Sequence, residues 1–127
     1  MNNQPPSSEQ RQEYRLNSHE TVFIELASAS HDGQQPEEIL VSQSVDISAN
    51  GLQVLVNQPL EMNRILPVAV SLEDLETPIN LITEVKWIIA DETNEQWMVG
   101  LALLESDDTR LGEWKHLIAQ RLLDTPE

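Results

Sequence analysis

Six short segments in which apolar and polar residues alternate fill the middle of this sequence, and they constrain its fold more than any other feature. A period of two is typical of a strand with one face on a core and the other in water. Turn-forming pairs, among them Asp32-Gly33, Asn50-Gly51 and Thr77-Pro78, separate several of these segments. The alternating apolar residues are Val22, Ile24 and Leu26; Ile39, Val41, Val45 and Ile47; Leu52, Val54 and Val56; Leu66, Val68, Val70 and Leu72; Ile79, Leu81, Val85, Trp87 and Ile89; and Trp97, Val99, Leu101 and Leu103. Six short strands at regular spacing predict an antiparallel barrel or sandwich over about residues 21–104.

The end of the chain changes from strand to helix periodicity. Apolar residues recur there at intervals of three and four, at Leu111, Trp114, Leu117, Ile118 and Leu122. Candidate N-caps precede them at Ser106, Asp107 and Asp108, and basic residues lie late in the segment, which suits the helix dipole. One amphipathic helix over about residues 108–123 is therefore predicted to close the domain. A chain of 127 residues has room for one such domain.

The two ends of the sequence have the composition of tails. Residues 1–10 are Asn, Gln, Pro and Ser with one Met and one Glu, which predicts a flexible tail, and residues 124–127 form a second short one. The first ten residues lack the basic and apolar regions of a secretory signal. No apolar run reaches the roughly 20 residues that span a bilayer. We therefore expect a soluble cytoplasmic protein without membrane insertion.

The charge and the residue inventory exclude several classes of function. The chain holds 22 acidic and 7 basic side chains, a net charge of −15, which disfavours sequence-independent binding to nucleic acid or anionic membranes. It has no cysteine, and its three histidines, at positions 19, 31 and 116, form no pair at metal-ligand spacing. No nucleophile elbow, Gly-rich phosphate loop or zinc-protease motif is present. We therefore predict no catalytic residue, no metal site, no cofactor and no enzymatic activity.

Two of the seven basic residues, Arg11 and Arg15, stand four positions apart just before the first predicted strand. Paired guanidinium groups clamp a phosphate or stack on a purine, because Arg offers a planar fork of donors. Taken alone, the pair is better explained as a coincidence on a solvated segment with Glu9 and Glu13 as neighbours.

A second motif, Asp46-Ile47-Ser48-Ala49-Asn50-Gly51, lies where the second predicted strand turns into the third. Gly51 leaves room for a ligand or permits a positive φ, and the Asp46 carboxylate can accept hydrogen bonds from the N1–H and N2–H₂ edge of guanine. The alternative is an ordinary hairpin, because Asn-Gly is a strong turn signal.

Together the two motifs, Arg11-xxx-Arg15 and Asp46-x-Ser48-x-x-Gly51, resemble the cyclic di-GMP signature of the PilZ domain family. The resemblance extends from Gln10 to about Leu123 and implies a small stand-alone member, with a six-stranded antiparallel β-barrel and a C-terminal helix over residues 11–123. It implies that Arg11 and Arg15 contact phosphates and guanine faces, and that Asp46, Ser48 and Gly51 surround a guanine. Trp87 resembles a tryptophan that lies near the ligand in some members, and its alternative is a place in the barrel core.

One departure from the family pattern concerns stoichiometry. Many members that bind a stacked ligand dimer have a second Arg directly before the Arg motif, and this chain has Gln10 there. The number of bound ligand molecules, one or two, is therefore open.

The resemblance implies a cyclic di-GMP receptor whose N-terminal arm, residues 11–15, changes conformation on binding and signals to a protein partner that the sequence does not identify. Its alternative is a nucleotide-independent adaptor of the PilZ type in motility or secretion. An oligonucleotide-binding barrel fits least, because such barrels need basic grooves and stacking aromatics, and aromatic residues are 4% of this chain.

Overall fold

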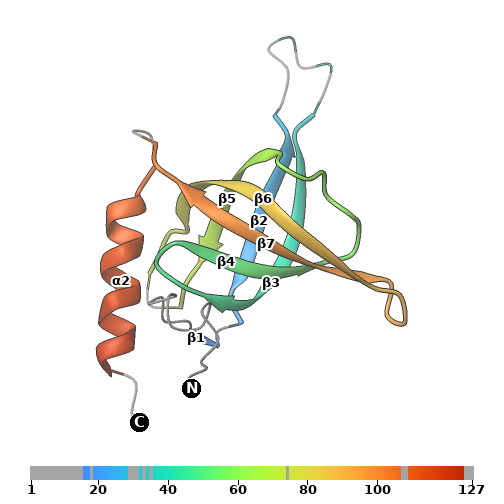
Figure 1. The fold of residues 1–127 in the computed structure, drawn as a ribbon. Helices are drawn as coiled ribbons and strands as arrows, with labels where there is room; N and C mark the ends of the chain where they lie inside the picture. Colours follow the sequence, from blue (N-terminus) through green and yellow to red (C-terminus); the bar gives the residue numbers. More distant parts are fainter. Residues whose placement is uncertain are drawn as a thin grey trace, which may run out of the picture.

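The computed structural model describes residues 16–17, 19–28, 32, 34, 36–73, 75–106 and 109–124. These residues form seven strands followed by one helix (Figure 1). The elements are β1 (Leu16–Asn17), β2 (Thr21–Ala27), β3 (Glu38–Ile47), β4 (Gly51–Val56), β5 (Ile65–Ser71), β6 (Ile79–Asp91), β7 (Gln96–Leu104) and α2 (Leu111–Asp124). The predicted tail at 1–10 and the Arg arm at 11–15 lie outside the described residues, as do residues 125–127 of the predicted tail at 124–127. Residue 124 belongs to α2, so that tail was predicted one residue too early.

The six longer strands close into an antiparallel barrel. They pair in the order β3-β2-β5-β6-β7-β4, and β4 pairs again with β3 to complete the ring. The two-residue strand β1 adds to the end of β3. β2 and β7 are three places apart in a ring of six, so they belong to opposite walls, and β7 passes across β2 in Figure 1. The predicted fold, a six-stranded antiparallel barrel with a C-terminal helix, is confirmed.

The barrel interior is filled mainly by aliphatic side chains, as the scarcity of aromatic residues requires. Alternate residues of β2, β4, β5 and β6 point inward, and the largest fully buried side chain is Trp114 of the helix. Two buried hydroxyls within the barrel wall donate to carbonyl oxygens of neighbouring strands, Ser42 to Val22 at 2.9 Å and Thr83 to Leu66 at 2.8 Å. These polar groups are therefore buried with their hydrogen bonds made.

The second predicted strand differs from its expected pattern. Its apolar residues were expected to alternate from Ile39 to Ile47, but Ile39 and Val41 point outward, at 41% and 62% exposed, while Leu40 and Ser42 point inward. Ile47 is fully buried because the register shifts between Ser44 and Asp46. Such a β-bulge inserts one residue and exchanges the two faces of the strand, so no single alternation describes β3.

Helix α2 begins at Leu111, three residues after the expected start near residue 108. Ser106 lies five residues before the helix, and its carbonyl accepts hydrogen bonds from the backbone and hydroxyl of Thr109 in a separate turn. The Arg110 carbonyl accepts the first helical bond, from the Trp114 amide at 2.9 Å. The other two cap candidates, Asp107 and Asp108, lie outside the described residues.

The helix packs on the barrel through its buried residues Trp114 and Ile118. Arg121 near its end forms an ion pair with Glu20, just before β2, at 3.1 Å. In Figure 1 the helix runs beside the turn between β3 and β4. Within the described residues, no helix has the length and apolar character needed to cross a bilayer.

Candidate ligand-binding site

The turn between β3 and β4 carries the Asp/Ser/Gly motif and is held by Ser48. The Ser48 amide donates to the Gly51 carbonyl at 2.9 Å, and its hydroxyl donates to the same oxygen at 3.2 Å. The Ser48 side chain is fully buried. Ser48 therefore fixes the shape of the turn, and a direct contact between Ser48 and a ligand stays a prediction.

Two neighbouring elements anchor the same turn from outside. The indole N–H of Trp114 on α2 donates to the Ser48 carbonyl at 2.9 Å, and the Leu103 amide on β7 donates to the Asn50 carbonyl at 2.9 Å. Asn50 does not have a positive φ, so the Asn-Gly pair does not form the common two-residue hairpin turn that requires one. These two tertiary hydrogen bonds hold the turn in place alongside the bonds that Ser48 makes within it.

Gly51 is required by close packing of two strands. A Cβ at this position would lie 2.5 Å from the carbonyl oxygen of Leu101 on β7, a backbone atom that cannot move aside cheaply. No positive φ is involved, so of the two expected reasons for this glycine, close approach is the one that applies. The neighbour that approaches in this structure is β7.

Asp46 belongs to a row of paired residues that crosses five strands on the outer face of the barrel. Asp46 is paired with Asn17 of β1 on one side and with Gln53 of β4 on the other. Gln53 is paired with Gly100 of β7, and Gly100 is paired with Trp87 of β6. Neighbouring strands lie about 4.8 Å apart, so Gly100 is about 10 Å from Asp46 along this row.

Trp87 lies on the outside of the barrel, so the alternative that placed it in the core is wrong. A register shift between Val85 and Trp87 makes Lys86 a bulge residue, and Trp87 then points outward while Val85 points inward. The indole covers Gly100: a Cβ on Gly100 would lie 2.2 Å from the indole Cε2. Trp87 is half-buried by this contact, and it stacks on backbone that only a glycine exposes.

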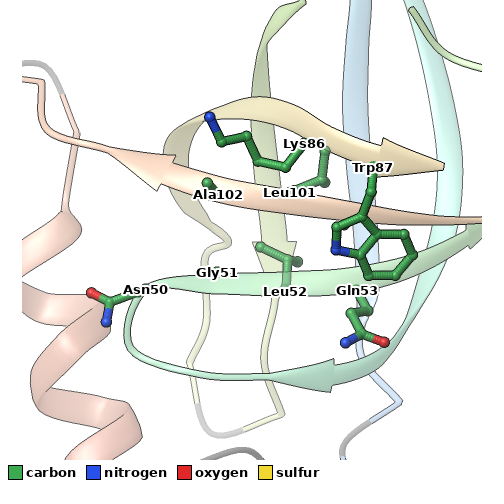
Figure 2. Close-up of a pocket in the computed structure, with 9 residues that line it drawn as sticks. Asn50, Gly51, Leu52, Gln53, Lys86, Trp87, Leu101 and Ala102 are labelled. Carbon is green, nitrogen blue, oxygen red and sulfur yellow. The ribbon is translucent and has the colours of Figure 1, made fainter. Parts of the chain in front are cut away.

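A pocket of about 180 Å³ lies along this part of the surface (Figure 2). It is lined by Asn50, Gly51, Leu52, Gln53, Lys86, Trp87, Gly100, Leu101 and Ala102. Figure 2 shows the Lys86 and Trp87 side chains pointing away from each other. The Lys86 ammonium lies 3.5 Å from a carboxylate oxygen of Glu84, and its side chain is half exposed. An anion bound at this pocket would therefore meet the Lys86 ammonium, whose charge Glu84 already partly neutralises.

The structure brings Gly51 and Trp87 to one pocket and places Asp46 and Ser48 beside it. Arg11 and Arg15 lie outside the described residues. Leu16, which follows Arg15 directly, is paired with Ile47, so β1 leads the chain to the motif on β3. Gln53 and Lys86 were not among the predicted site residues. Lys86 had a weak signal, as one of only seven cations and the neighbour of Trp87, whereas Gln53 had none.

No group of three or more His, Cys, Asp or Glu residues in the described part of the chain is arranged to hold a metal ion. The candidate site instead combines two glycines, one of them covered by an indole, with an amide, a carboxylate and an ammonium. This set of groups suits recognition of a planar polar ligand by stacking and hydrogen bonding.

Residues 9–120 match the PilZ domain family. The chain belongs to the PilZ domain family. PilZ domains are not enzymes, which agrees with the predicted absence of enzymatic activity.

Solved PilZ proteins share the fold at low sequence identity. The Bacillus subtilis inhibitor of motility (MotI/DgrA) has a TM-score of 0.67 and 22% identity, covering 92% of this chain and 53% of that protein. The MrkH–c-di-GMP complex of K. pneumonia has a TM-score of 0.63 and 18% identity, covering 90% and 51%. The PilZ domain of YcgR from Escherichia coli, solved with c-di-GMP, has a TM-score of 0.59 and 14% identity, covering 92% and 99%.

The present chain thus spans about half the length of the first two proteins and nearly all of the third. Identities this low establish a common fold. No curated protein matches the sequence significantly.

Proposed function

We propose that this PilZ domain is a cytoplasmic receptor that binds cyclic di-GMP on the outer face of β3, β4, β7 and β6. The observation that carries the proposal is the paired row from Asp46 through Gln53 and Gly100 to Trp87, which adjoins the pocket at Gly51. It supports a continuous binding face built from residues far apart in the sequence.

Each end of the row suits a different part of the ligand. The Asp46 carboxylate accepts hydrogen bonds from the N1–H and N2–H₂ edge of a guanine, and it is half-buried, which strengthens such bonds. The Trp87 indole offers a flat surface for a purine or for the ribose-phosphate ring. Between them, Gly100 has no side chain, so the Trp87 indole can lie directly against its backbone.

In the proposal, Arg11 and Arg15 supply the guanidinium groups that neutralise the two phosphates and stack on the guanines. Support comes from β1, which pairs the residue after Arg15 with Ile47, next to the Asp/Ser/Gly turn. The net charge of −15 does not prevent binding, because charges beyond about 8 Å are screened at physiological salt while guanidinium contacts act locally. It does disfavour longer polyanions.

The signal in this proposal is a shift in the population of the N-terminal arm. A ligand that binds only the arrangement in which residues 11–15 lie against the barrel shifts the arm toward that arrangement. The arm and the adjoining barrel surface then form what a protein partner recognises. Because Gln10 replaces the second Arg of many members, one or two ligand molecules could fill the site, and the stoichiometry fitted in a calorimetric titration distinguishes the two cases.

Isothermal titration calorimetry of cyclic di-GMP into the wild-type chain tests the proposal. We expect saturable heat that is lost in Arg11→Ala/Arg15→Ala and in Asp46→Asn. A matched control is Glu92→Gln, which also converts an acid to an amide but lies in the hairpin between β6 and β7. Circular dichroism verifies that each variant is folded. A silent titration of well-folded wild-type protein would refute the receptor function and favour the nucleotide-independent adaptor.

A further inference from the structure

An apolar surface covers the barrel wall opposite the candidate ligand site. On β2, the outward-facing Phe23 is paired with Val41 of β3 on one side and with Ala69 of β5 on the other. One row further along, Ile39 of β3 pairs with Glu25 of β2, and Pro67 of β5 pairs with Ile82 of β6. We call these six residues the β2 face: Phe23, Ile39, Val41, Pro67, Ala69 and Ile82.

The β2 face is exposed and hollowed. Val41 is 62% exposed and Ile39 is 41% exposed, and both would have been inward-facing had β3 kept one alternation along its length. A second pocket, of about 340 Å³, is lined by five of the six β2-face residues, all but Val41. Ile65, 50% exposed, extends the apolar character along β5. A contiguous apolar patch with a groove in it is typical of a surface that contacts another molecule.

The edge of the β2 face is acidic. Glu25 lines the groove, and Glu37 and Glu38 are exposed directly before Ile39. Glu84 lies across from Ile65 in the sheet.

Among the described residues, two of the three nearby cations are paired with carboxylates. Lys86 pairs with Glu84 and Arg110 pairs with Glu113, whereas the Arg64 guanidinium donates to the neutral Leu26 carbonyl and keeps its charge. The groove is therefore surrounded by carboxylates that outnumber the available positive charge, which makes an apolar segment with basic flanks its complement.

We propose that the β2 face is the docking surface for the protein partner, and that it receives a partner segment with large apolar side chains flanked by Lys or Arg. A second copy of this chain fits poorly, because each copy carries a net charge of −15 and would bring its own acidic rim. Residues 1–15 also fit poorly, since Met1 and Tyr14 are their only large apolar side chains.

The inference supplies the partner surface for the proposed receptor function and therefore rests on it. β2 and β7 are on opposite walls of the barrel, so the β2 face and the face with Gly51 and Trp87 can be occupied together. The two surfaces are also separable by experiment, because no β2-face residue lines the candidate ligand pocket.

The test uses a synthetic probe, a fluorescent ten-residue peptide with a Leu-Val-Phe-Leu centre and three lysines on each side. Two matched probes replace the six lysines with glutamates, or the four apolar residues with serines. Fluorescence anisotropy at about 0.15 M salt, where charges beyond about 8 Å are screened, measures the affinity of each. Val41→Lys is compared with Ile89→Lys, since Ile89 is 61% exposed on β6 and receives the same change of charge. Each titration is repeated with saturating cyclic di-GMP.

We expect the lysine-flanked apolar probe to bind wild-type protein and the Ile89→Lys variant alike, and to bind Val41→Lys at least about tenfold more weakly, a loss of about 1.4 kcal/mol. Neither matched probe should bind comparably. Amide shifts in a ¹⁵N correlation spectrum should map to β2, β3 and β5. Equal losses in both variants, equal binding of the serine probe, or shifts confined to the other wall would overturn the docking surface. Nucleotide binding is measured separately by calorimetry, so its failure is distinguishable from failure of peptide docking.

Discussion

Replacing Gly100 with alanine tests the contact that places Trp87 in the candidate site. A methyl group there would lie 2.2 Å from the indole Cε2 and 2.3 Å from Nε1. Carbon atoms in contact are separated by about 3.5–4.0 Å, so the indole has to retreat by more than roughly 1 Å. Overpacking of this kind typically costs ~1–3 kcal/mol. No positive φ restricts the position, so the loss would come from the indole alone.

A double-mutant cycle with Trp87→Ala isolates this contact. Without the indole, the new methyl group has space, and alanine in a strand is favoured over glycine by roughly 0.5–1 kcal/mol. Gly100→Ala should therefore destabilise the wild type by about 1–3 kcal/mol and be neutral or stabilising in Trp87→Ala, giving a coupling of about 1–4 kcal/mol. Urea unfolding followed by circular dichroism measures all four proteins without depending on tryptophan emission. If Gly100→Ala costs the same in both backgrounds, the stacking of Trp87 on Gly100 is refuted.

Three further changes have expected outcomes. Gly112→Ala should raise the free energy of unfolding by about 0.5–1 kcal/mol in a urea titration, because a Cβ there meets nothing within 4 Å and alanine favours the helix; a loss of stability would contradict the open space seen there. Trp114→Phe should lower it by about 1–3 kcal/mol, because the buried Ser48 carbonyl loses its indole donor; an unchanged midpoint would refute the anchoring of the turn. Arg110 holds the pKa of Glu113 below its ordinary value of 4.5, so the small advantage of wild type over Glu113→Gln should be present above pH 4.5 and disappear as the pH falls through the lowered pKa. A stability advantage of wild type over Glu113→Gln that grows as the pH falls would contradict a lowered pKa for Glu113.

The architecture could be predicted because the strands are amphipathic over most of their length. Alternation located all six barrel strands, and the spacing of Trp114 and Ile118 located the helix. The two-residue strand β1 was not predicted, since Leu16 and Asn17 are too few to carry a period. Its existence depends on pairing with Asp46 and Ile47, a tertiary contact.

Prediction of which face a residue occupies failed at two register shifts, one in β3 and one in β6. The shift between Ser44 and Asp46 turns Ile39 and Val41 outward, and the shift beside Lys86 turns Trp87 outward. A bulge changes which face a residue occupies without changing the residue types around it, so periodicity cannot locate it. The bulge in β3 turns two residues of the β2 face, Ile39 and Val41, outward, and the bulge in β6 gives Trp87 its outer position.

The candidate site was only partly accessible from sequence. The motif residues Asp46 and Gly51 and the indole of Trp87 were identified, but their alignment on one row depends on strand register across β3, β4, β7 and β6. Gln53 enters the site through that register alone. The Ser48 side chain is buried under the turn, where its hydroxyl donates to the Gly51 carbonyl, and its contact with a ligand stays a prediction.

The most direct test of the central claim follows backbone amide and indole N–H signals in a ¹⁵N correlation spectrum during titration with cyclic di-GMP. We expect the largest shifts on Asp46, Gly51, Gln53, Gly100 and the indole of Trp87. Residues 11–15 should shift with them, and the β2 face should change little. Shifts centred on another wall of the barrel, or an unchanged spectrum at saturating nucleotide, would contradict this expectation.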